Sequence, residues 1–313
     1  MHAPDGVPEV SAGDDLVSLL LAVAELADGD VVAVTSKVVS KAEGRVRAGT
    51  REDALADETL RVLARRGGTS IVRTHHGLTL AAAGIDNSNV EPGRVVLLPA
   101  DPDASARALR HRIRERTGRN VAVVVTDTAG RAWREGQTDI AIGAAGLQVL
   151  EEYAGRVDAH GNELAVTAPA VADEIAGAAE LAQGKLGGRP FAVVRGRADL
   201  VLPPGDDGPG ATAIVRPDGA DMFGYGSREA VLAALRGNAG EITAFGGPAA
   251  ADDLVAALSS LARVTDPARD GDTVRCRPET AARQAAVAVA FAHGWVTVGA
   301  LDAAEVRFRP VSP

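Results

Sequence analysis

The sequence is poor in the residue types on which several classes of protein depend. It contains a single cysteine, Cys276, which excludes a disulfide framework and a cysteine-based zinc site. Aromatic residues make up only 3% of the 313 residues, which disfavours recognition of single-stranded nucleic acid by base stacking. No apolar run is long enough to cross a bilayer, and residues 1–10 lack the basic start and apolar stretch of a secretory signal.

Basic residues are also outnumbered. Lysine and arginine total 33 and aspartate and glutamate 42, so the formal net charge is −9. Binding to nucleic acid or to a membrane surface needs a basic face, so we expect neither. These features together predict a cytoplasmic protein whose partners are small molecules.

Helical and extended patterns alternate along the chain, and no long repeat is visible. Apolar residues at helical spacing predict a helix over 14–27, and an uninterrupted apolar run predicts a buried strand over 31–34. The alternation is too irregular for a doubly wound sheet, so we expect an α+β (mixed α/β) fold with mixed sheets and packed helices.

Capping signals place two more helices. Thr50 is expected to begin a helix that carries acidic residues early, arginines late, and ends at Gly67-Gly68. Asp101 and Pro102 predict the start of another, which ends at Gly118. Further strands are expected over 71–72, 95–98, 121–125, 191–194 and 295–298, and further helices over 170–186, 252–263 and 279–293. A glycine-rich stretch spans 130–146, and composition predicts a loop over 203–210.

The segment 35–41 (TSKVVSK) is the best candidate for phosphate binding. It follows the strand over 31–34, where hydroxyl, backbone N–H and ammonium groups can hold phosphate oxygens. The chain has neither a P-loop motif nor a dinucleotide fingerprint. From the pattern alone, a solvated strand end is the simpler interpretation.

Two acidic positions are candidate ligands for a divalent cation. Asp86 lies in the segment 84–89 (GIDNSN), and Asp127 with Thr128 follows the valine-rich strand. Strand ends are where α/β enzymes place such ligands, but an aspartate that caps a turn explains Asp127 equally well. For Asp86 a turn is the more usual explanation, and the pattern is a weak signal on its own.

The segment 130–139 (GRAWREGQTD) places Arg131, Arg134 and Glu135 among glycines. Arginine grips carboxylates and phosphates, so this density suits an anionic substrate. The alternative is a surface loop with ion pairs worth less than about 1 kcal/mol each.

Four segments, in this order, resemble the coenzyme F420-0:γ-glutamyl ligases. They are DVVAVTSKVVSKAEGR (30–45), AAGIDNSNV (82–90), VVVTDTAGRAWREGQTDIAIGAAGL (123–147) and 173–196 with its Gly184-Lys185. The third is long and specific, and the resemblance extends from residue 6 to about residue 230. It implies an F420:γ-glutamyl ligase-like fold.

The resemblance also implies site residues. The positions that match the family's GTP contacts are Val7, Pro8, Glu9, Val10, Ser36, Lys41 and Asn89. Asp86 and Asp127 match ligands of a divalent cation, Mg²⁺ or Mn²⁺, and Thr128 matches a ligand of a second one. K⁺ stays open as a further cation. We assign Arg131, Arg134 and Glu135 to the catalytic group, with the arginines on substrate anions or on the phosphoryl in transfer.

The implied reaction joins L-glutamate to coenzyme F420-0 with GTP as co-substrate, through an acyl phosphate, and adds a second glutamate through a γ-linkage. Members of the family look like intertwined homodimers, so a homodimer is expected. Two other classes remain open: a metal-dependent phosphohydrolase or phosphotransferase using the same aspartates, and a non-catalytic nucleotide-binding partner.

The sequence departs from the family in three respects. The family has a complete strand before its Gly-Leu-Pro, whereas here Gly6-Val7-Pro8 stands near the start, so we expect a shortened first strand or a downstream start. Actinobacterial relatives carry a flavin-binding, nitroreductase-like domain, for which the remaining chain is too short, so no flavin is expected. We therefore predict a catalytic domain over 1–235 and a small C-terminal extension of unknown role over 236–313.

Overall fold

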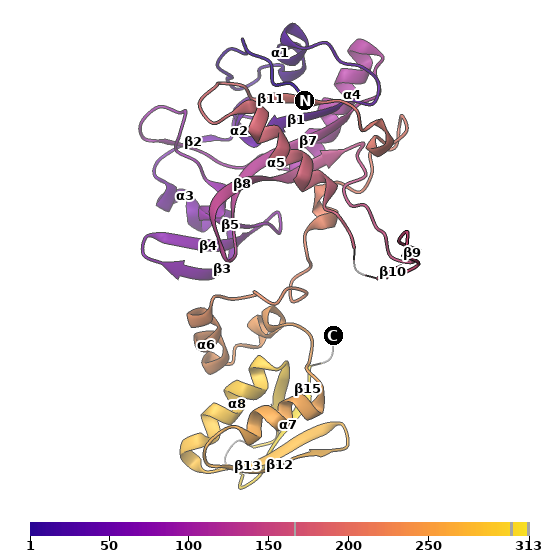
Figure 1. Cartoon of the computed structure of the whole chain (residues 1–313). Helices are drawn as coiled ribbons and strands as arrows, with labels where there is room; N and C mark the ends of the chain where they lie inside the picture. The colour runs from indigo at the N-terminus through magenta and orange to yellow at the C-terminus, as the bar shows by residue number, and fades with distance from the viewer. Residues whose placement is uncertain (166, 301–302, 312–313) are drawn as a thin grey trace. The chain divides into compact units, whose positions relative to one another are not determined.

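The chain folds as two compact units in the computed structural model, which describes residues 1–165, 167–300 and 303–311 (Figure 1). The first unit comprises Met1–Arg61 and Ile71–Val215, and the second comprises Val62–Ser70 and Arg216–Pro313. The division therefore falls earlier than the predicted boundary after residue 235. The reason is helix α6 (Ser227–Arg236), whose buried Ala234 packs with Phe291 of α8 (Arg283–Ala292) in the second unit.

A four-stranded mixed sheet forms the centre of the first unit. Its order is β11-β1-β7-β8, with β1 parallel to β7 and the other two pairs antiparallel. The strands are β1 (Val31–Thr35), β7 (Ala122–Arg131), β8 (Arg134–Ala145) and β11 (Phe191–Val194). The strands predicted over 31–34, 121–125 and 191–194 are thus present, and the α+β fold class is confirmed.

Helices cover both faces of this sheet. Val32 and Val34 lie in one apolar cluster with residues of α1 (Leu16–Val23) and α4 (Pro102–Thr117). Val31 lies in a second cluster with residues of α5 (Val171–Gln183). Because neighbouring side chains of a strand point to opposite faces, two covered faces require the uninterrupted apolar run seen in β1.

Local capping explains the ends of α4. The Asp101 carboxylate accepts a hydrogen bond from the Ala104 backbone N–H at 2.9 Å, and Pro102 occupies the first turn. Gly118 ends the helix in the left-handed region, with φ of 73°, which suits a residue without Cβ. Both predicted ends of this helix are confirmed.

The helix predicted from Thr50 to Gly67 is wrong in its second half. Thr50 does cap α3 (Arg51–Glu58), in a reciprocal arrangement with Asp53. The chain then becomes strand β3 (Thr59–Arg66), and Gly67-Gly68 forms the turn to β4 (Thr69–Thr74). A Gly-Gly pair between two extended runs is a hairpin signal, and the late arginines resembled a helix end by charge alone.

The glycine-rich stretch 130–146 is mainly strand rather than surface loop. β7 and β8 form a long antiparallel hairpin in which Thr128 pairs with Asp139 and Arg131 with Arg134. The register shifts between Val125 and Thr126 and again near Gly130. Such irregularities break strict alternation, so the sequence pattern does not reveal the second strand.

Smaller elements complete the first unit. They are α2 (Ser36–Ala42), β2 (Val46–Ala48), β5 (Thr79–Ala81), β6 (Arg94–Val96), β9 (Arg156–Val157) and β10 (Glu163–Leu164). β2 pairs with β6, β9 with β10, and β5 extends the β3–β4 hairpin. Before β1, His2 forms a single bridge with Val193 of β11. No helix among the described residues is long and apolar enough to cross a membrane.

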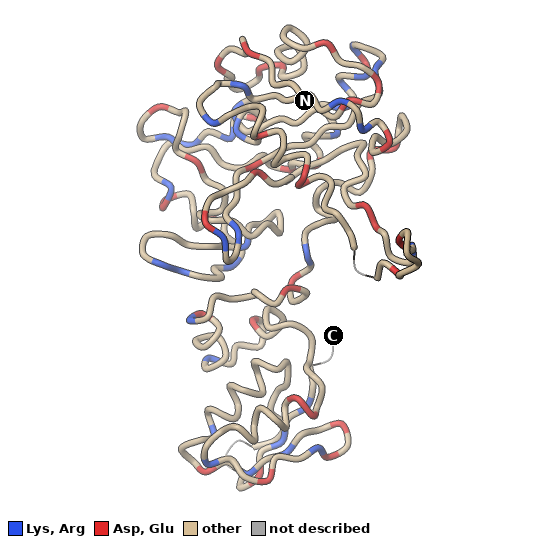
Figure 2. Tube along the Cα trace, in the orientation of Figure 1, with Lys and Arg blue, Asp and Glu red and all other residues tan. Residues whose placement is uncertain are grey.

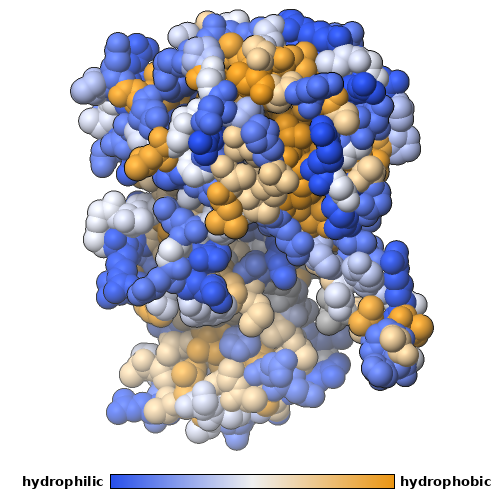
Figure 3. Space-filling model, turned by 45° about the horizontal axis from the view of Figure 1, so that its top comes forward, coloured by the Kyte–Doolittle hydropathy of each residue, from blue (hydrophilic) through white to orange (hydrophobic). Residues whose placement is uncertain are grey.

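The second unit has its own antiparallel sheet, of order β12-β13-β15-β14. Its elements are α7 (Ala251–Ser259), β12 (Val264–Asp270), β13 (Thr273–Pro278), β14 (Trp295–Val298) and β15 (Val306–Pro310), besides α6 and α8. Leu254, Leu258 and Phe308 are fully buried in its core with Cys276. Charged residues of both signs are spread over each unit (Figure 2), and apolar side chains lie exposed among them (Figure 3).

Candidate functional site

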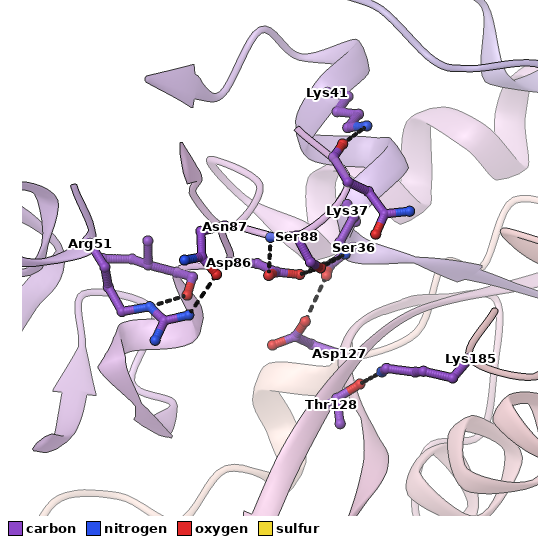
Figure 4. Close-up of polar contacts among 12 residues, drawn as sticks. Ser36, Lys37, Lys41, Arg51, Asp86, Asn87, Ser88, Asp127, Thr128 and Lys185 are labelled. Atoms are coloured by element: carbon purple, nitrogen blue, oxygen red, sulfur yellow. Dashed lines mark hydrogen bonds and ion pairs between the residues drawn. The ribbon is translucent and has the colours of Figure 1, made fainter. Parts of the chain in front are cut away.

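Ser36 and Asp127 meet where β1 ends and its parallel pairing with β7 stops. The register of β1 and β7 pairs Thr35 with Thr126, so the residues that follow them lie at the same edge: Ser36 begins α2, and Asp127 lies within β7. The Ser36 hydroxyl donates to the Asp127 carboxylate, with Oγ and Oδ1 2.8 Å apart (Figure 4). Residues from two predicted segments thus share the sheet edge at which α/β proteins commonly bind ligands.

Asp86 is brought to the same region by a shaped loop. Its backbone N–H and C=O both bond to Val96, and Ala83 just before it has a positive φ of 56°. The Lys37 ammonium lies 2.6 Å from the Asp86 carboxylate, and Ser88 donates to that carboxylate through both its N–H and its hydroxyl (Figure 4). Arg51 secures the loop by donating to the Ile85 carbonyl at 3.1 Å.

The two carboxylates differ in their electrostatics. Burial raises the pKa of Asp127 to about 7; the hydrogen bond from Ser36 opposes the rise, while the charges of Asp139 and Asp86 add to it. Burial also raises the pKa of Asp86, but the hydrogen bonds from Lys37 and Ser88 outweigh it, and the pKa lies below its usual value. Of the two, Asp86 has a cation, Lys37, among the causes of its pKa shift, and Asp127 has none.

Lys41 contacts two other predicted nucleotide positions, Asn89 and Glu9. Its ammonium donates to the Asn89 carbonyl at 2.6 Å and pairs with Glu9, and only 7% of the residue is exposed. It is therefore not the solvated lysine of the simpler interpretation. Val10 is buried in the core and Val7 packs against it, so of the segment 7–10 only Pro8 and Glu9 present exposed side chains.

Thr128 sits in a network of polar side chains next to Asp127. Its hydroxyl donates to Asp139 Oδ1 at 2.8 Å. The same oxygen accepts from the Lys185 ammonium at 2.9 Å (Figure 4). Asp139 is 3% exposed and also accepts from Thr126 Oγ1 at 2.9 Å. Burial and the nearby charge of Asp139 raise the pKa of Glu180, which lies 3.8 Å from Lys185.

The structure does not bring the predicted catalytic group to the carboxylates within one chain. Arg131, Arg134 and Glu135 are exposed near the tip of the β7–β8 hairpin, where Arg131 donates to the Glu135 carbonyl at 3.3 Å. Arg131 follows Asp127 by four residues, about 13 Å along an extended strand. Trp133, 83% exposed with a φ of 57°, stands at the turn.

The sequence assigned no role to Ser88 or Asp139, and it gave Lys37 only the phosphate-binding role shared by the segment 35–41. Lys37 and Ser88 surround Asp86 only because the loop over 85–89 folds back on α2. Asp139 could have been found by treating 123–147 as a hairpin, since that register places it opposite Thr128.

The donor set suits a hard cation. Carboxylate and hydroxyl oxygens of Asp86, Asp127, Ser36 and Thr128 are the ligand types that Mg²⁺ and Mn²⁺ prefer. The Lys37 ammonium contacts the Asp86 carboxylate, and the Lys185 ammonium contacts the Thr128 hydroxyl. The oxygens at this edge therefore already bind positively charged groups. Among the described residues no three His, Cys, Asp or Glu side chains form a metal-binding group, so water or substrate phosphates would have to complete the coordination.

A cavity of about 280 Å³ lies elsewhere in the first unit. It is lined by His76, Asp101 and Thr212 among apolar neighbours, and none of the predicted site residues reaches it. We place the candidate site at the carboxylates because charge and hydrogen bonding converge there, whereas the cavity has only ordinary polar groups.

The sequence is similar to that of known proteins over most of residues 1–215. The family model described as F420-0:Gamma-glutamyl ligase matches residues 6–54 and 51–196, which include Asp86, Asp127, Lys37, Lys41 and Lys185. The coenzyme F420:L-glutamate ligase of Methanopyrus kandleri is 41% identical over 239 residues, 69% of this chain and 93% of that protein. The ligase of Archaeoglobus fulgidus is 41% identical over 61% of this chain and 85% of its own length. That of Methanothermobacter thermautotrophicus is 36% identical over 70% of this chain and 96% of its own length. The chain belongs to the F420-0:γ-glutamyl ligase family.

Proposed function

We propose that the chain is a GTP-dependent ligase that joins L-glutamate to coenzyme F420-0, and then a second glutamate through the γ-carboxylate of the first. One observation carries the proposal: in a chain of this family, Asp86, Asp127 and Ser36 converge on one sheet edge beside Lys37. The relatives compared above are named for a glutamate ligase reaction on coenzyme F420.

The chemistry explains why such an edge is needed. A carboxylate is a poor electrophile, so its oxygen first attacks the γ-phosphorus of GTP, the bond to the β-phosphate breaks, and GDP leaves. The glutamate amine then attacks the carbonyl carbon of the acyl phosphate, the C–O bond to phosphate breaks, and the amine loses a proton. Both steps crowd negative charge, which positively charged groups must offset.

The residues divide this work by position. Lys41 and Lys37 supply ammonium groups for phosphate oxygens, and Asn89 and Glu9 position Lys41. Asp86, Asp127 and Thr128 would hold divalent cations, Mg²⁺ or Mn²⁺, which when bound neutralise the phosphates; K⁺ remains a candidate further cation. Arg131 and Arg134 lie at the tip of the β7–β8 hairpin, so they can contact a substrate anion only if that tip reaches the site of a second copy of the chain.

A homodimer would supply that site. The β7–β8 hairpin carries two arginines, a glutamate and an exposed tryptophan at its end. Exposed tryptophan and arginine are typical of protein interfaces, and a hairpin tip can enter the site of a second copy. This arrangement would restore the predicted role of Arg131, Arg134 and Glu135 in trans.

Incubation with F420-0, L-glutamate, GTP and Mn²⁺, followed by mass spectrometry, tests the proposal. We expect F420-0 to gain glutamyl units, and GDP to appear only when both acceptor and glutamate are present. GDP release with neither would indicate a phosphohydrolase instead. Nucleotide binding without turnover would indicate a non-catalytic partner. The isosteric Asp127→Asn variant is the matched control and should be inactive.

A further inference from the structure

Asp139 is a buried carboxylate that none of the proposed chemical steps uses. It lies on β8, directly opposite Thr128 in the hairpin register, and is 3% exposed. A charge is costly to bury unless it is hydrogen-bonded, so its environment needs a reason. Both of its oxygens are occupied: Oδ2 accepts from Thr126 at 2.9 Å and Oδ1 accepts from Thr128 at 2.8 Å.

These two bonds determine where the hydroxyl protons point. In each bond the threonine hydroxyl donates and a carboxylate oxygen accepts, so the single hydroxyl proton of each threonine is directed at Asp139. Thr126, 1% exposed, holds the second oxygen and prevents the carboxylate from rotating. Thr128 Oγ1 is left with nothing but lone pairs on its remaining side.

A positive group already occupies that side. The Lys185 ammonium donates to Thr128 Oγ1 at 2.9 Å and lies 3.8 Å from the Glu180 carboxylate (Figure 4). An ammonium has donors and no acceptor, so this contact exists only because Thr128 does not direct its proton there. The oxygen therefore accepts a cation in the observed arrangement.

We propose that Asp139 is a positioning residue, which holds the hydroxyl proton of Thr128 inward so that its oxygen presents lone pairs to a bound cation. The inference rests on the proposed function, in which Thr128 is a cation ligand. Asp139 touches neither substrate nor cation and acts through Thr128. Outer partners of this kind commonly change metal affinity by about 10- to 100-fold when they are replaced.

Mn²⁺ binding to the full-length chain, followed by electron paramagnetic resonance after removal of endogenous metal, tests this role without turnover. We expect the unaltered protein to bind Mn²⁺ at two classes of site, one that includes Thr128 and one formed by Asp86 and Asp127. The isosteric Asp139→Asn change removes the charge and replaces one acceptor oxygen by an N–H₂ group, so the side chain can no longer accept from both threonine hydroxyls at once and the Thr128 proton is held less firmly. Binding at the Thr128 class should weaken by at least about tenfold, and the Asp86/Asp127 class by less than about threefold.

Three further variants separate positioning from other roles. Thr128→Val should lose Mn²⁺ binding at the Thr128 class of site. The double variant with Thr128→Val and Asp139→Asn should bind no more weakly than Thr128→Val alone. Thr128→Ser, which keeps the hydroxyl, should retain that class. Asp139→Glu keeps the charge but displaces the carboxylate, and should weaken that class as Asp139→Asn does; circular dichroism checks that each variant is folded.

Several outcomes would overturn the proposal. Unchanged binding in Asp139→Asn, full binding in Asp139→Glu, or additive losses with Thr128→Val would each show that Asp139 does not act by aligning Thr128. Equal weakening of both classes would show a general charge effect. If the unaltered protein bound no Mn²⁺, the cation centre of the proposed function would fail as well, which is a different result from loss in the variants alone.

Discussion

Ser36 and Asp127 are 91 positions apart in the chain, yet their side chains are joined by a hydrogen bond of 2.8 Å between Oγ and Oδ1. The contact arises because β1 and β7 are parallel neighbours, and Ser36 and Asp127 directly follow their last paired residues, Thr35 and Thr126. Burial raises the pKa of Asp127, and the hydrogen bond from the Ser36 side chain lowers it. The serine therefore keeps a desolvated carboxylate closer to its charged form.

Replacing Ser36 by alanine should weaken cation binding in a pH-dependent way. Without the hydroxyl, the pKa of Asp127 should rise further above about 7, and more of the carboxylate should hold a proton at neutral pH. Mn²⁺ affinity measured by calorimetry should fall by about 3- to 10-fold at pH 7, with a smaller loss at pH 9. Ser36→Thr, which keeps a hydroxyl, is the matched control. A loss that is equal at both pH values would contradict this account.

Asp127→Asn should stabilise the metal-free protein at alkaline pH. A carboxyl whose pKa is about 7 when folded and 3.8 when unfolded binds more protons in the folded state. Stability is then lost as pH rises between those values, and the uncharged amide escapes this loss. We expect the unfolding free energy of Asp127→Asn in chelator to be about 1–3 kcal/mol higher than that of the unaltered protein at pH 8. This is less than the full pKa difference implies, because Asp127 is partly exposed and solvent screens its charge.

Urea unfolding at pH 4 provides the comparison for that prediction. Both proteins should carry an uncharged group at position 127 there, so the difference should shrink toward zero. A variant that is less stable than the unaltered protein at pH 8 would show that the charged carboxylate contributes to the fold.

Local signals allowed much of the fold to be predicted. The ends of α4 follow from Asp101, Pro102 and Gly118, which act within one turn of the helix. The strand β11 (Phe191–Val194) follows from a short apolar run. These features depend on neighbours in the sequence, which a pattern can represent.

Non-local pairing explains what could not be predicted. The contact of Thr128 with Asp139 depends on the register of a hairpin that contains bulges and exposed glycines. The contact of Lys37 with Asp86 spans two segments with no pattern that links them. Individual site residues were therefore identifiable through the resemblance, whereas their hydrogen-bond partners required the structure.

The two-unit division predicts how truncation should behave. A chain that ends at Val215 keeps both apolar clusters of the first unit, so we expect it to fold and to bind GTP. A chain that ends at Gly247 would retain Ala234 and Ile242 but lose Phe291, against which they pack. The longer fragment should therefore be the more aggregation-prone of the two, as size-exclusion chromatography would show. Equal solubility of the two fragments would place the boundary elsewhere.

Lys41 provides the sharpest test of the nucleotide site. Its ammonium is nearly buried, bonded to the Asn89 carbonyl and paired with Glu9, and each of these is a predicted nucleotide position. A lysine that contacts phosphate makes a charge-assisted hydrogen bond worth roughly 1.5–3 kcal/mol. Lys41→Met keeps most of the side-chain volume and removes the charge.

The KM of the Lys41→Met variant for GTP should rise by about 10- to 100-fold, at about 1.4 kcal/mol per tenfold change. The KM for glutamate should change much less, because that substrate offers carboxylates to other groups. Glu9→Gln is the matched control, since it removes the partner charge and leaves the ammonium in place, and its effect on GTP should be smaller. An unchanged KM for GTP, or an equal rise for GTP and glutamate, would leave Lys41 as a structural bridge between the segments that hold Glu9 and Asn89.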